Sequence, residues 1–166
     1  AKTLATPVSV FAMLTLPPAA AHADLVFEHD GHTYRLVELP ATWSGATTAA
    51  KAMTLAGKPG YLARINSAGE NQAILEAVIS HLSPAQLANS IPNDGSESAF
   101  VWLGGSDAGR EGQWTWTNNG DLFWQGDFNG APVNGRYTNW GVQPDNIGGA
   151  ENALAMSLEG WPEPFY

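Results

Sequence analysis

Tryptophan and glycine are distributed very unevenly along this chain of 166 residues, and this asymmetry most constrains its fold. Six of the seven tryptophans and twelve of the eighteen glycines lie at or beyond Phe100. Large indole rings favour burial, and glycine permits turns and close backbone approaches. We therefore predict that the second half is an ordered, loop-rich region anchored by aromatic side chains, and that the helices lie in the first half.

Two helices are predicted in the first half. Thr42 is a suitable N-cap for a helix over 43–56, where apolar residues recur at spacings of three and four. Ser67 and Glu70 have the spacing of a capping box, in which each side chain satisfies the other residue's helix-end amide, and this predicts a helix over 68–82. The polar, proline-containing segment 83–98 is expected to be a surface loop.

Short strands account for the rest of the regular structure. Asp30-Gly31 is a strong two-residue hairpin signal between apolar segments. Residues 121–152 are rich in Gly, Asn, Pro and Asp, so we expect little regular structure there. The strands expected besides the hairpin cover 61–65, 100–103, 113–117 and 153–158. Helices followed by strands predict an α+β class.

Composition excludes several functions. Seven Lys and Arg stand against sixteen Asp and Glu, which gives a net charge of −9 and disfavours binding to nucleic acid. Cysteine is absent, so disulfides, thiolate zinc sites and cysteine nucleophiles are excluded. The hydrophobic share of 44% is compatible with a globular domain.

The first 23 residues resemble an export signal. Lys2 precedes an apolar run over 8–16, and Ala21-His22-Ala23 matches a small-x-small cleavage site. We therefore expect a signal peptide over 1–23 and one domain over 24–166, secreted, periplasmic or at the cell surface. The alternative for the apolar run is a buried strand at the edge of the domain. The run over 8–16 is too short to span a bilayer, and no other apolar stretch is long enough for a membrane helix.

A cluster of oxygen-bearing side chains lies within 138–152. Carboxylates and amides of this kind suit Ca²⁺, which takes about 6–8 oxygen ligands. Pro144 separates Gln143 from Asp145, and a cis peptide bond before it would direct both side chains the same way. The alternative is a solvated Asn/Asp/Gly turn cluster. The residues concerned are Gln143, Asp145, Asn146, Glu151 and Asn152.

Four motifs in order resemble the C-type lectin-like domain. The segment 100–107 (FVWLGGSD) resembles the Trp-Ile-Gly-Leu strand of that family, and 111–116 (EGQWTW) resembles its Gly-x-Trp-x-Trp segment. Asn139-Trp140 with Gln143-Pro144-Asp145 resembles the long-loop calcium motif, and Glu151-Asn152 follows at the family's spacing. The resemblance covers nearly all of 24–166 and implies an α+β fold with two helices, short antiparallel sheets and a long loop.

The resemblance also implies a site and a ligand. Gln143, Asp145 and Glu151, with Asn152, would bind Ca²⁺. Sugar hydroxyls would complete the shell and hydrogen-bond Gln143, Asp145, Asn146 and Glu151. In the family, Gln-Pro-Asp accompanies galactose-type ligands.

The chain departs from the family at three places. Ala153 stands where a cysteine is usual, a replacement found in bacterial relatives. Ile147-Gly148-Gly149 stands where galactose-type sites carry an aromatic residue. Trp161-Pro162-Glu163 replaces the Trp-Asn-Asp strand that supplies further calcium ligands, so we expect the final strand to lie beyond Tyr166.

The leading interpretation is a non-enzymatic, Ca²⁺-dependent carbohydrate-binding domain. The alternative is a Ca²⁺-independent module on the same fold that binds a protein or has a structural role. A glycosidase would need a carboxylate pair, for which the candidates beside Asp145 and Glu151 are Asp107, Glu111, Asp121 and Asp127.

Aromatic and histidine side chains have two possible roles each. Trp102, Trp114 and Trp116 alternate in strands, so we expect them in the core rather than as sugar platforms. We expect Trp140 to anchor the loop. Asn118 and Asn119 could contribute to a second calcium site. Three of the four histidines are not paired with an acid or a serine by any motif and are expected to have no catalytic or metal-binding role; they are His29, His32 and His81.

Overall fold

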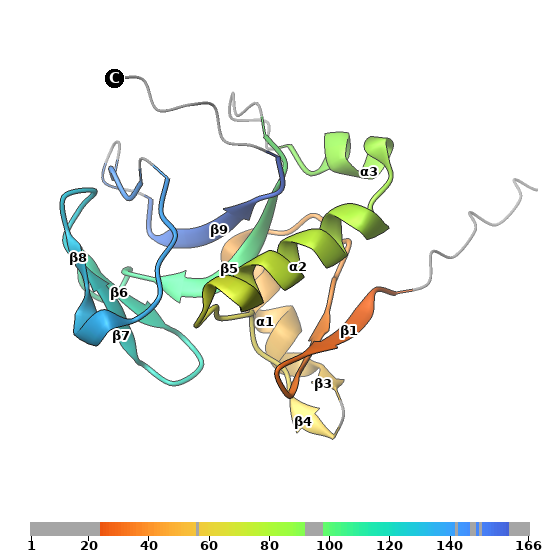
Figure 1. Cartoon of the computed structure of the whole chain (residues 1–166), viewed down its shortest axis with the longest axis horizontal. Helices are drawn as coiled ribbons and strands as arrows, with labels where there is room; N and C mark the ends of the chain where they lie inside the picture. Colours follow the sequence, from red (N-terminus) through yellow and green to blue (C-terminus); the bar gives the residue numbers. More distant parts are fainter. Residues whose placement is uncertain are drawn as a thin grey trace, which may run out of the picture.

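The computed structural model describes residues 24–55, 57–91, 98–141, 143–146, 149 and 151–159 (Figure 1). The expected signal peptide over 1–23, Ile147, Gly148 and the segment containing Trp161 and Glu163 lie outside the described residues. The described part combines three α-helices with antiparallel sheets, which confirms an α+β class. None of these helices has the length and apolar character needed to cross a bilayer.

The described chain begins with the predicted hairpin. Strands β1 (Val26–His29) and β2 (His32–Arg35) pair antiparallel, with His29 opposite His32. The two turn residues, Asp30 and Gly31, both have positive φ angles, of 46° and 76°. This is the backbone of a two-residue turn whose twist matches that of the strands, and it explains why Asp-Gly is found there.

Helix α1 (Trp43–Ala52) begins where the sequence predicts it and ends earlier. The Thr42 side chain accepts a hydrogen bond from the Gly45 N–H at 3.2 Å, as expected of the N-cap. The expected end at residue 56 is wrong, because two short strands, β3 (Thr54–Leu55) and β4 (Lys58–Pro59), form a small hairpin. Gly57 supplies the positive φ angle, 74°, between them.

Helix α2 (Ala68–His81) confirms the second predicted helix. Ser67 Oγ accepts from the Glu70 N–H at 3.1 Å, as a capping box requires. The reciprocal bond differs from the prediction, since Glu70 Oε2 accepts from the Asn66 N–H at 2.6 Å instead of from Ser67. Glu70 therefore reaches one residue beyond the cap and fixes the chain that enters the helix.

The predicted surface loop over 83–98 is wrong in its first part. Residues Pro84–Asn89 form a third helix, α3, with a complete capping box between Ser83 and Gln86. The Ser83 N–H donates to Gln86 Oε1 at 2.9 Å, and the Gln86 N–H donates to Ser83 Oγ at 3.3 Å. Ser-Pro with Gln three residues after the serine is a helix-start signal that could have predicted this element. Residues 92–97 lie outside the described part.

The second half forms a five-stranded antiparallel sheet with the order β8-β7-β6-β5-β9. Its predicted strands are confirmed in β5 (Phe100–Ser106), β6 (Gln113–Trp116) and β9 (Ala153–Ser157). Residues 121–152 contain more regular structure than expected, so that prediction is wrong in part. The additional elements are β7 (Leu122–Gln125), β8 (Ala131–Pro132) and the 3₁₀ helix η1 (Val133–Gly135).

The strand predicted over 61–65 is not formed. The segment runs alongside β5 but contributes one backbone bond there, from the Gly104 N–H to the Ala63 carbonyl at 2.8 Å. A Cβ on Gly104 would lie 2.5 Å from the Leu62 carbonyl oxygen, so only glycine permits this approach.

Two clusters of buried side chains make up the core. The first is mostly aliphatic and joins α2 to β5 and β9; its buried members are Ile65, Ile74, Val78, Leu82, Ala99, Leu103, Met156 and Leu158. The second is aromatic and lies on β6 and β7; its buried members are Trp114, Trp116, Phe123 and Trp124. Leu154 on β9 packs against both clusters.

The expectation that three tryptophans belong to the core holds for two of them. Trp114 and Trp116 are 3% and 4% exposed, whereas Trp102 is 39% exposed. Side chains alternate along β5, so Leu103 takes the core-facing position next to it. The Trp102 indole instead donates to the Ala41 carbonyl at 2.9 Å across the surface.

Candidate functional site

The predicted calcium loop is anchored on the aromatic cluster. The Trp140 ring lies edge-on to Trp114 and Trp124, with ring centroids 5.1 and 5.9 Å apart. It also stacks near Phe123 at 6.2 Å. The predicted role of Trp140 as a loop anchor is confirmed, and it fixes the point from which the ligand-bearing segment starts.

Gln143 and Asp145 are brought together around a buried proline. The Gln143–Pro144 peptide bond is cis, as the sequence suggested, and Pro144 is buried. The Asp145 N–H donates to Gln143 Oε1 at 3.0 Å, so the amide folds back over the turn. Both predicted ligands therefore lie on one short turn.

The two ends of the predicted site are tied to each other and to the sheet. The Glu151 N–H donates to Asn146 Oδ1 at 3.4 Å, which links the first part of the site to the second. The Asn152 carbonyl accepts from Ser106 Oγ at 2.6 Å. Strand β9 starts at the next residue, so Glu151 and Asn152 lie where the loop joins the end of β5.

Asp145 has an enclosed carboxylate oxygen within the predicted ligand set. Its Oδ1 atom is enclosed and has no hydrogen-bond partner. An enclosed carboxylate oxygen is costly unless a donor or a cation satisfies it. The side chains around this turn offer only oxygen as a ligand atom, which suits Ca²⁺. The residues thus fit the ion chemically, although the described residues contain no group of three or more His, Asp or Glu placed to hold a metal.

Three of the four other carboxylates considered for a glycosidase pair have hydrogen-bond partners. Asp107, 2% exposed, accepts from the Gly112 N–H at 3.0 Å through Oδ2, while its Oδ1, like that of Asp145, is enclosed and has no hydrogen-bond partner. Asp121 accepts from Arg136 at 3.0 Å, and Asp127 from the Asn129 N–H at 2.8 Å. Glu111 is exposed. The contacts of Asp121 and Asp127 account for these two carboxylates as surface and turn contacts.

The Asn118-Asn119 turn also has a local explanation. Asn119 Oδ1 accepts from the Asp121 N–H at 3.1 Å.

A buried carboxylate that sequence reasoning missed lies at the start of α2. Glu70 is 5% exposed and accepts hydrogen bonds from the Tyr34 hydroxyl and from the Asn66 backbone. His32 Nδ1 lies 3.4 Å from Glu70 Oε1. Burial, followed by the hydrogen bond from Tyr34 to Glu70, raises the pKa of the Tyr34 phenol well above its usual range. The capping motif predicts the place of Glu70, but nothing local indicates partners 36 residues away in sequence.

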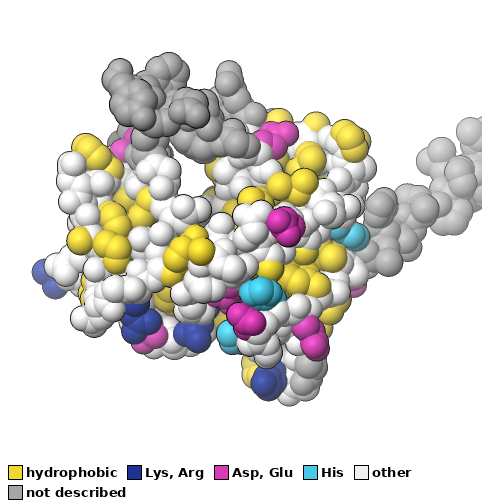
Figure 2. All heavy atoms as spheres, viewed as in Figure 1, with side chains coloured by type: hydrophobic (Ala, Val, Ile, Leu, Met, Phe, Trp, Pro, Cys, Tyr) yellow, Lys and Arg dark blue, Asp and Glu magenta, His cyan; other side chains and the backbone are white. Residues whose placement is uncertain are grey.

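The three histidines each have an acidic neighbour, contrary to the absence of partners inferred from the sequence. Besides His32, His81 lies 2.8 Å from Glu38 and His29 lies 3.4 Å from Asp30. Figure 2 shows histidine and acidic side chains next to each other on the face that carries α2 and the hairpin. The pairs His32–Glu70 and His81–Glu38 connect the hairpin and the segment after it to α2, whereas His29–Asp30 lies within the hairpin.

Comparison with known proteins gives three similarities. The chain is 33% identical over 129 residues to halomucin of Haloquadratum walsbyi, in an alignment that covers 74% of this chain and 1% of halomucin. It is 29% identical over 96 residues to Snaclec 5 of Echis pyramidum leakeyi and to Snaclec 9 of Echis carinatus sochureki. Each of these two alignments covers 58% of this chain and 54% of the snaclec, about half its length. No protein-family model matches the chain, and no solved structure matches it.

These similarities agree with the resemblance seen in the motifs. Snaclecs are snake C-type lectin-like proteins, so the match supports a C-type lectin-like relationship for this chain. Together with halomucin they indicate a lectin-like or extracellular module. The identities say nothing about calcium or about a particular ligand, so both stay predictions.

Proposed function

We propose that this protein is an exported module that binds carbohydrate in a Ca²⁺-dependent manner and does not turn it over. The observation that carries this proposal is the enclosed, unpartnered Oδ1 of Asp145 within a turn whose side chains offer oxygen ligands. The expected export segment and the similarity to halomucin and the snaclecs support a location outside the cytoplasm.

The site residues divide into those that would hold the ion and those that would also orient the ligand. Gln143, Asp145, Glu151 and Asn152 would hold the ion. When bound, Ca²⁺ supplies coordination positions that a pair of sugar hydroxyls can fill in place of water. Amide and carboxylate groups of Gln143, Asp145, Asn146 and Glu151 would receive and donate hydrogen bonds that fix the direction of those hydroxyls.

The aromatic anchor gives the site its rigidity. Trp140 is packed on the aromatic cluster, and Asn152 is bonded to Ser106 at the end of β5. The ligand-bearing turn is therefore held at both ends by the sheet. A site held in this way loses less conformational entropy on binding than a free loop would.

Calorimetric titration of Ca²⁺ into the full chain tests the proposal. We expect saturable binding in the wild type and its loss in Asp145→Asn, which keeps the shape of the side chain and removes its charge. Glu76→Gln is the matched control, because Glu76 is an exposed carboxylate on α2 that bonds Gln72 at 2.7 Å. Binding that persists unchanged in Asp145→Asn would contradict the proposed site. A glycan array with and without chelator then tests the ligand class.

A Ca²⁺-independent protein-binding module is the second candidate. It is supported by the exposed aromatic side chains of Trp102 and Phe128, which are 39% and 59% exposed. Exposed aromatic groups are enriched at protein interfaces. A folded wild-type chain that gives no heat with Ca²⁺ would favour this second function over the first.

A further inference from the structure

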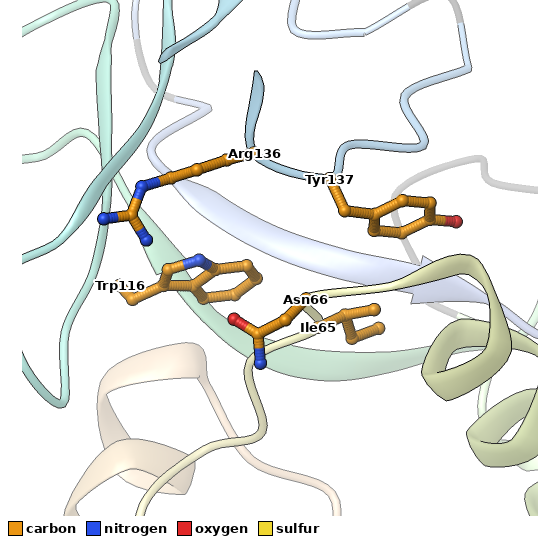
Figure 3. Close-up of a pocket in the computed structure, with 5 residues that line it drawn as sticks. All are labelled: Ile65, Asn66, Trp116, Arg136 and Tyr137. Carbon is orange, nitrogen blue, oxygen red and sulfur yellow. The ribbon is translucent and has the colours of Figure 1, made fainter. Parts of the chain in front are cut away.

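A small hollow, lined by none of the predicted calcium ligands, lies where three segments meet (Figure 3). Ile65 and Asn66 come from the segment that leads into α2, and Trp116 comes from the end of β6. Arg136 and Tyr137 come from the chain that follows η1. The hollow measures about 230 Å³. Small-molecule sites typically measure about 300–1,000 Å³, so this one suits a ligand of about one sugar ring.

The apolar lining of the hollow is fixed by packing. Ile65 and Trp116 are 5% and 4% exposed, and Trp116 stacks on Phe123 with ring centroids 4.3 Å apart. Tyr137 lies on the other side of the hollow, with its hydroxyl directed away from Arg136 (Figure 3). Burial raises the pKa of the Tyr137 phenol above its usual value.

The polar groups of the hollow are held in place by partners outside it. Glu70 Oε2 accepts from both the backbone N–H and the side-chain Nδ2 of Asn66, at 2.6 and 3.3 Å. This engages the amide nitrogen and leaves Oδ1, which points toward Trp116 (Figure 3), as an acceptor. Arg136 Nη1 donates to Asp121 Oδ2 at 3.0 Å, which orients the guanidinium. The site is thus largely arranged before any ligand enters.

The charge balance decides the class of ligand. Asp121 neutralises Arg136, and the chain as a whole carries a net charge of −9, so an anionic ligand would be repelled. The Arg136 fork offers donors, and Asn66 offers an acceptor. Hydroxyl groups use both kinds of partner, whereas a carboxylate uses donors alone. Arg136 Nε is enclosed and has no acceptor, and such an unsatisfied donor is unusual in a packed surface.

We propose that this hollow is a second, metal-independent binding site for a neutral sugar unit. Arg136 and Asn66 hydrogen-bond its hydroxyls, while Tyr137 and the small exposed parts of Ile65 and Trp116 contact its apolar face. Glu70 is a positioning residue, because it orients Asn66 without lining the hollow. The proposal does not depend on the calcium loop, since none of its residues belongs to 138–152.

The test is NMR titration of the full chain in excess EDTA, with glucose, galactose and glucuronate as probes. We expect shifts of the Trp116 and Asn66 side-chain N–H signals with a neutral hexose, with dissociation constants of about millimolar, and no shifts with glucuronate. Arg136→Met and Asn66→Ala should each weaken binding by about tenfold, as expected for loss of one hydrogen-bonding partner. Arg35→Met is the matched control, because Arg35 is 38% exposed and also pairs with an aspartate, Asp24.

The outcomes separate this proposal from the calcium site. Binding in EDTA that survives Asp145→Asn and is weakened by the two hollow variants supports it. The proposal is overturned if neither hexose shifts these signals at concentrations up to about 100-fold the expected dissociation constant. It is also overturned if Arg136→Met and Arg35→Met bind the hexose equally well. Binding of glucuronate in preference to glucose and galactose overturns the neutral class. Sugar binding that occurs only with Ca²⁺ leaves the function proposed above intact and refutes the second site.

Discussion

The aliphatic and aromatic halves of the core differ in how they are assembled. The aliphatic cluster takes Ile74, Val78 and Leu82 from one continuous stretch around α2 and covers them with strands. The aromatic cluster takes its four buried rings from two short strands and adds Trp140 from a loop. The first cluster therefore follows from the helical spacing of apolar residues along α2, whereas the second depends on contacts between separate segments. The proposed calcium loop is built on the aromatic half, whereas the hollow lies between the halves, with Ile65 from the aliphatic cluster and Trp116 from the aromatic one.

This difference has a consequence for function. A helix face tolerates changes in the loops around it, because its own hydrogen bonds are internal. A cluster of rings from several segments fixes the position of each segment, so the loss of one ring affects every segment that packs against it. Trp116 lines the hollow and Trp140 anchors the calcium loop, and both pack against Phe123. Phe123 thus contacts one supporting ring of each site.

Phe123→Ala should give the largest effect. Removing a ring that is 2% exposed should lower the free energy of unfolding by about 3–5 kcal/mol. It should also weaken Ca²⁺ binding, because Trp140 loses a neighbour. Urea unfolding, near-UV circular dichroism and the calcium titration measure these changes.

Ile74→Ala is the matched change in the aliphatic half. It should cost about 2–5 kcal/mol and leave both the near-UV signal of the tryptophans and Ca²⁺ binding as in the wild type. Equal loss of calcium affinity in the two variants would contradict the distinction between the halves.

Gly105→Ala should give the next largest effect, because Gly105 lies where the two clusters meet. An added Cβ would lie 2.8 Å from Leu154 Cδ2 and 3.1 Å from Phe123 Cζ. Such overpacking should cost about 1–3 kcal/mol, measured by thermal or urea unfolding. Gly109→Ala in the β5–β6 turn is the control, since nothing lies within 4 Å of its Cβ position. Comparable losses in both variants would show that crowding at the junction is not the cause.

Tyr34→Phe should give the smallest effect and should act on the aliphatic half alone. Loss of the hydrogen bond to the buried Glu70 should cost about 1.5 kcal/mol, at the low end for charged partners because Tyr34 is only partly buried. The raised pKa of Tyr34 means that the folded state holds the phenol proton more tightly than the unfolded state does. This stabilisation is present below a pH of about 10 and is lost as the pH rises above it.

Urea unfolding at pH 8 and near pH 11 tests the pH dependence. The difference in stability between wild type and Tyr34→Phe should shrink at the higher pH. A difference that stays constant would show that folding does not raise the pKa of Tyr34. Tyr61→Phe, at a tyrosine that is 43% exposed, serves as the control.

The sequence predicted the elements that rest on local signals. Asp30-Gly31 gave the hairpin, and the Ser67 cap gave the second helix. The alternation of Trp114 and Trp116 gave a strand with a buried face. The third helix was missed although its signal, Ser83 with Pro84 and Gln86, is equally local. Strands β7 and β8 were missed because they are short and exist through pairing with β6 and with each other.

The sequence predicted which residues form the candidate site but not how they are arranged in space. The type and spacing of Gln143, Asp145 and Glu151 follow from the sequence alone. The enclosure of Asp145 Oδ1 and the link between Asn146 and Glu151 depend on how the loop packs. The hollow beside Trp116 had no sequence signal, because its lining residues are dispersed between 65 and 137.

The sequence by itself determined the class of the fold, the helix starts, the tight turn and the oxygen chemistry of the long loop, because each depends on residues within a few positions of one another. Only the tertiary structure decided which tryptophan faces solvent, which histidine meets an acid, and where Arg136 approaches Asn66. Those outcomes depend on contacts between segments tens of residues apart, and the closing of such distances is determined by packing of the whole chain rather than by any local preference.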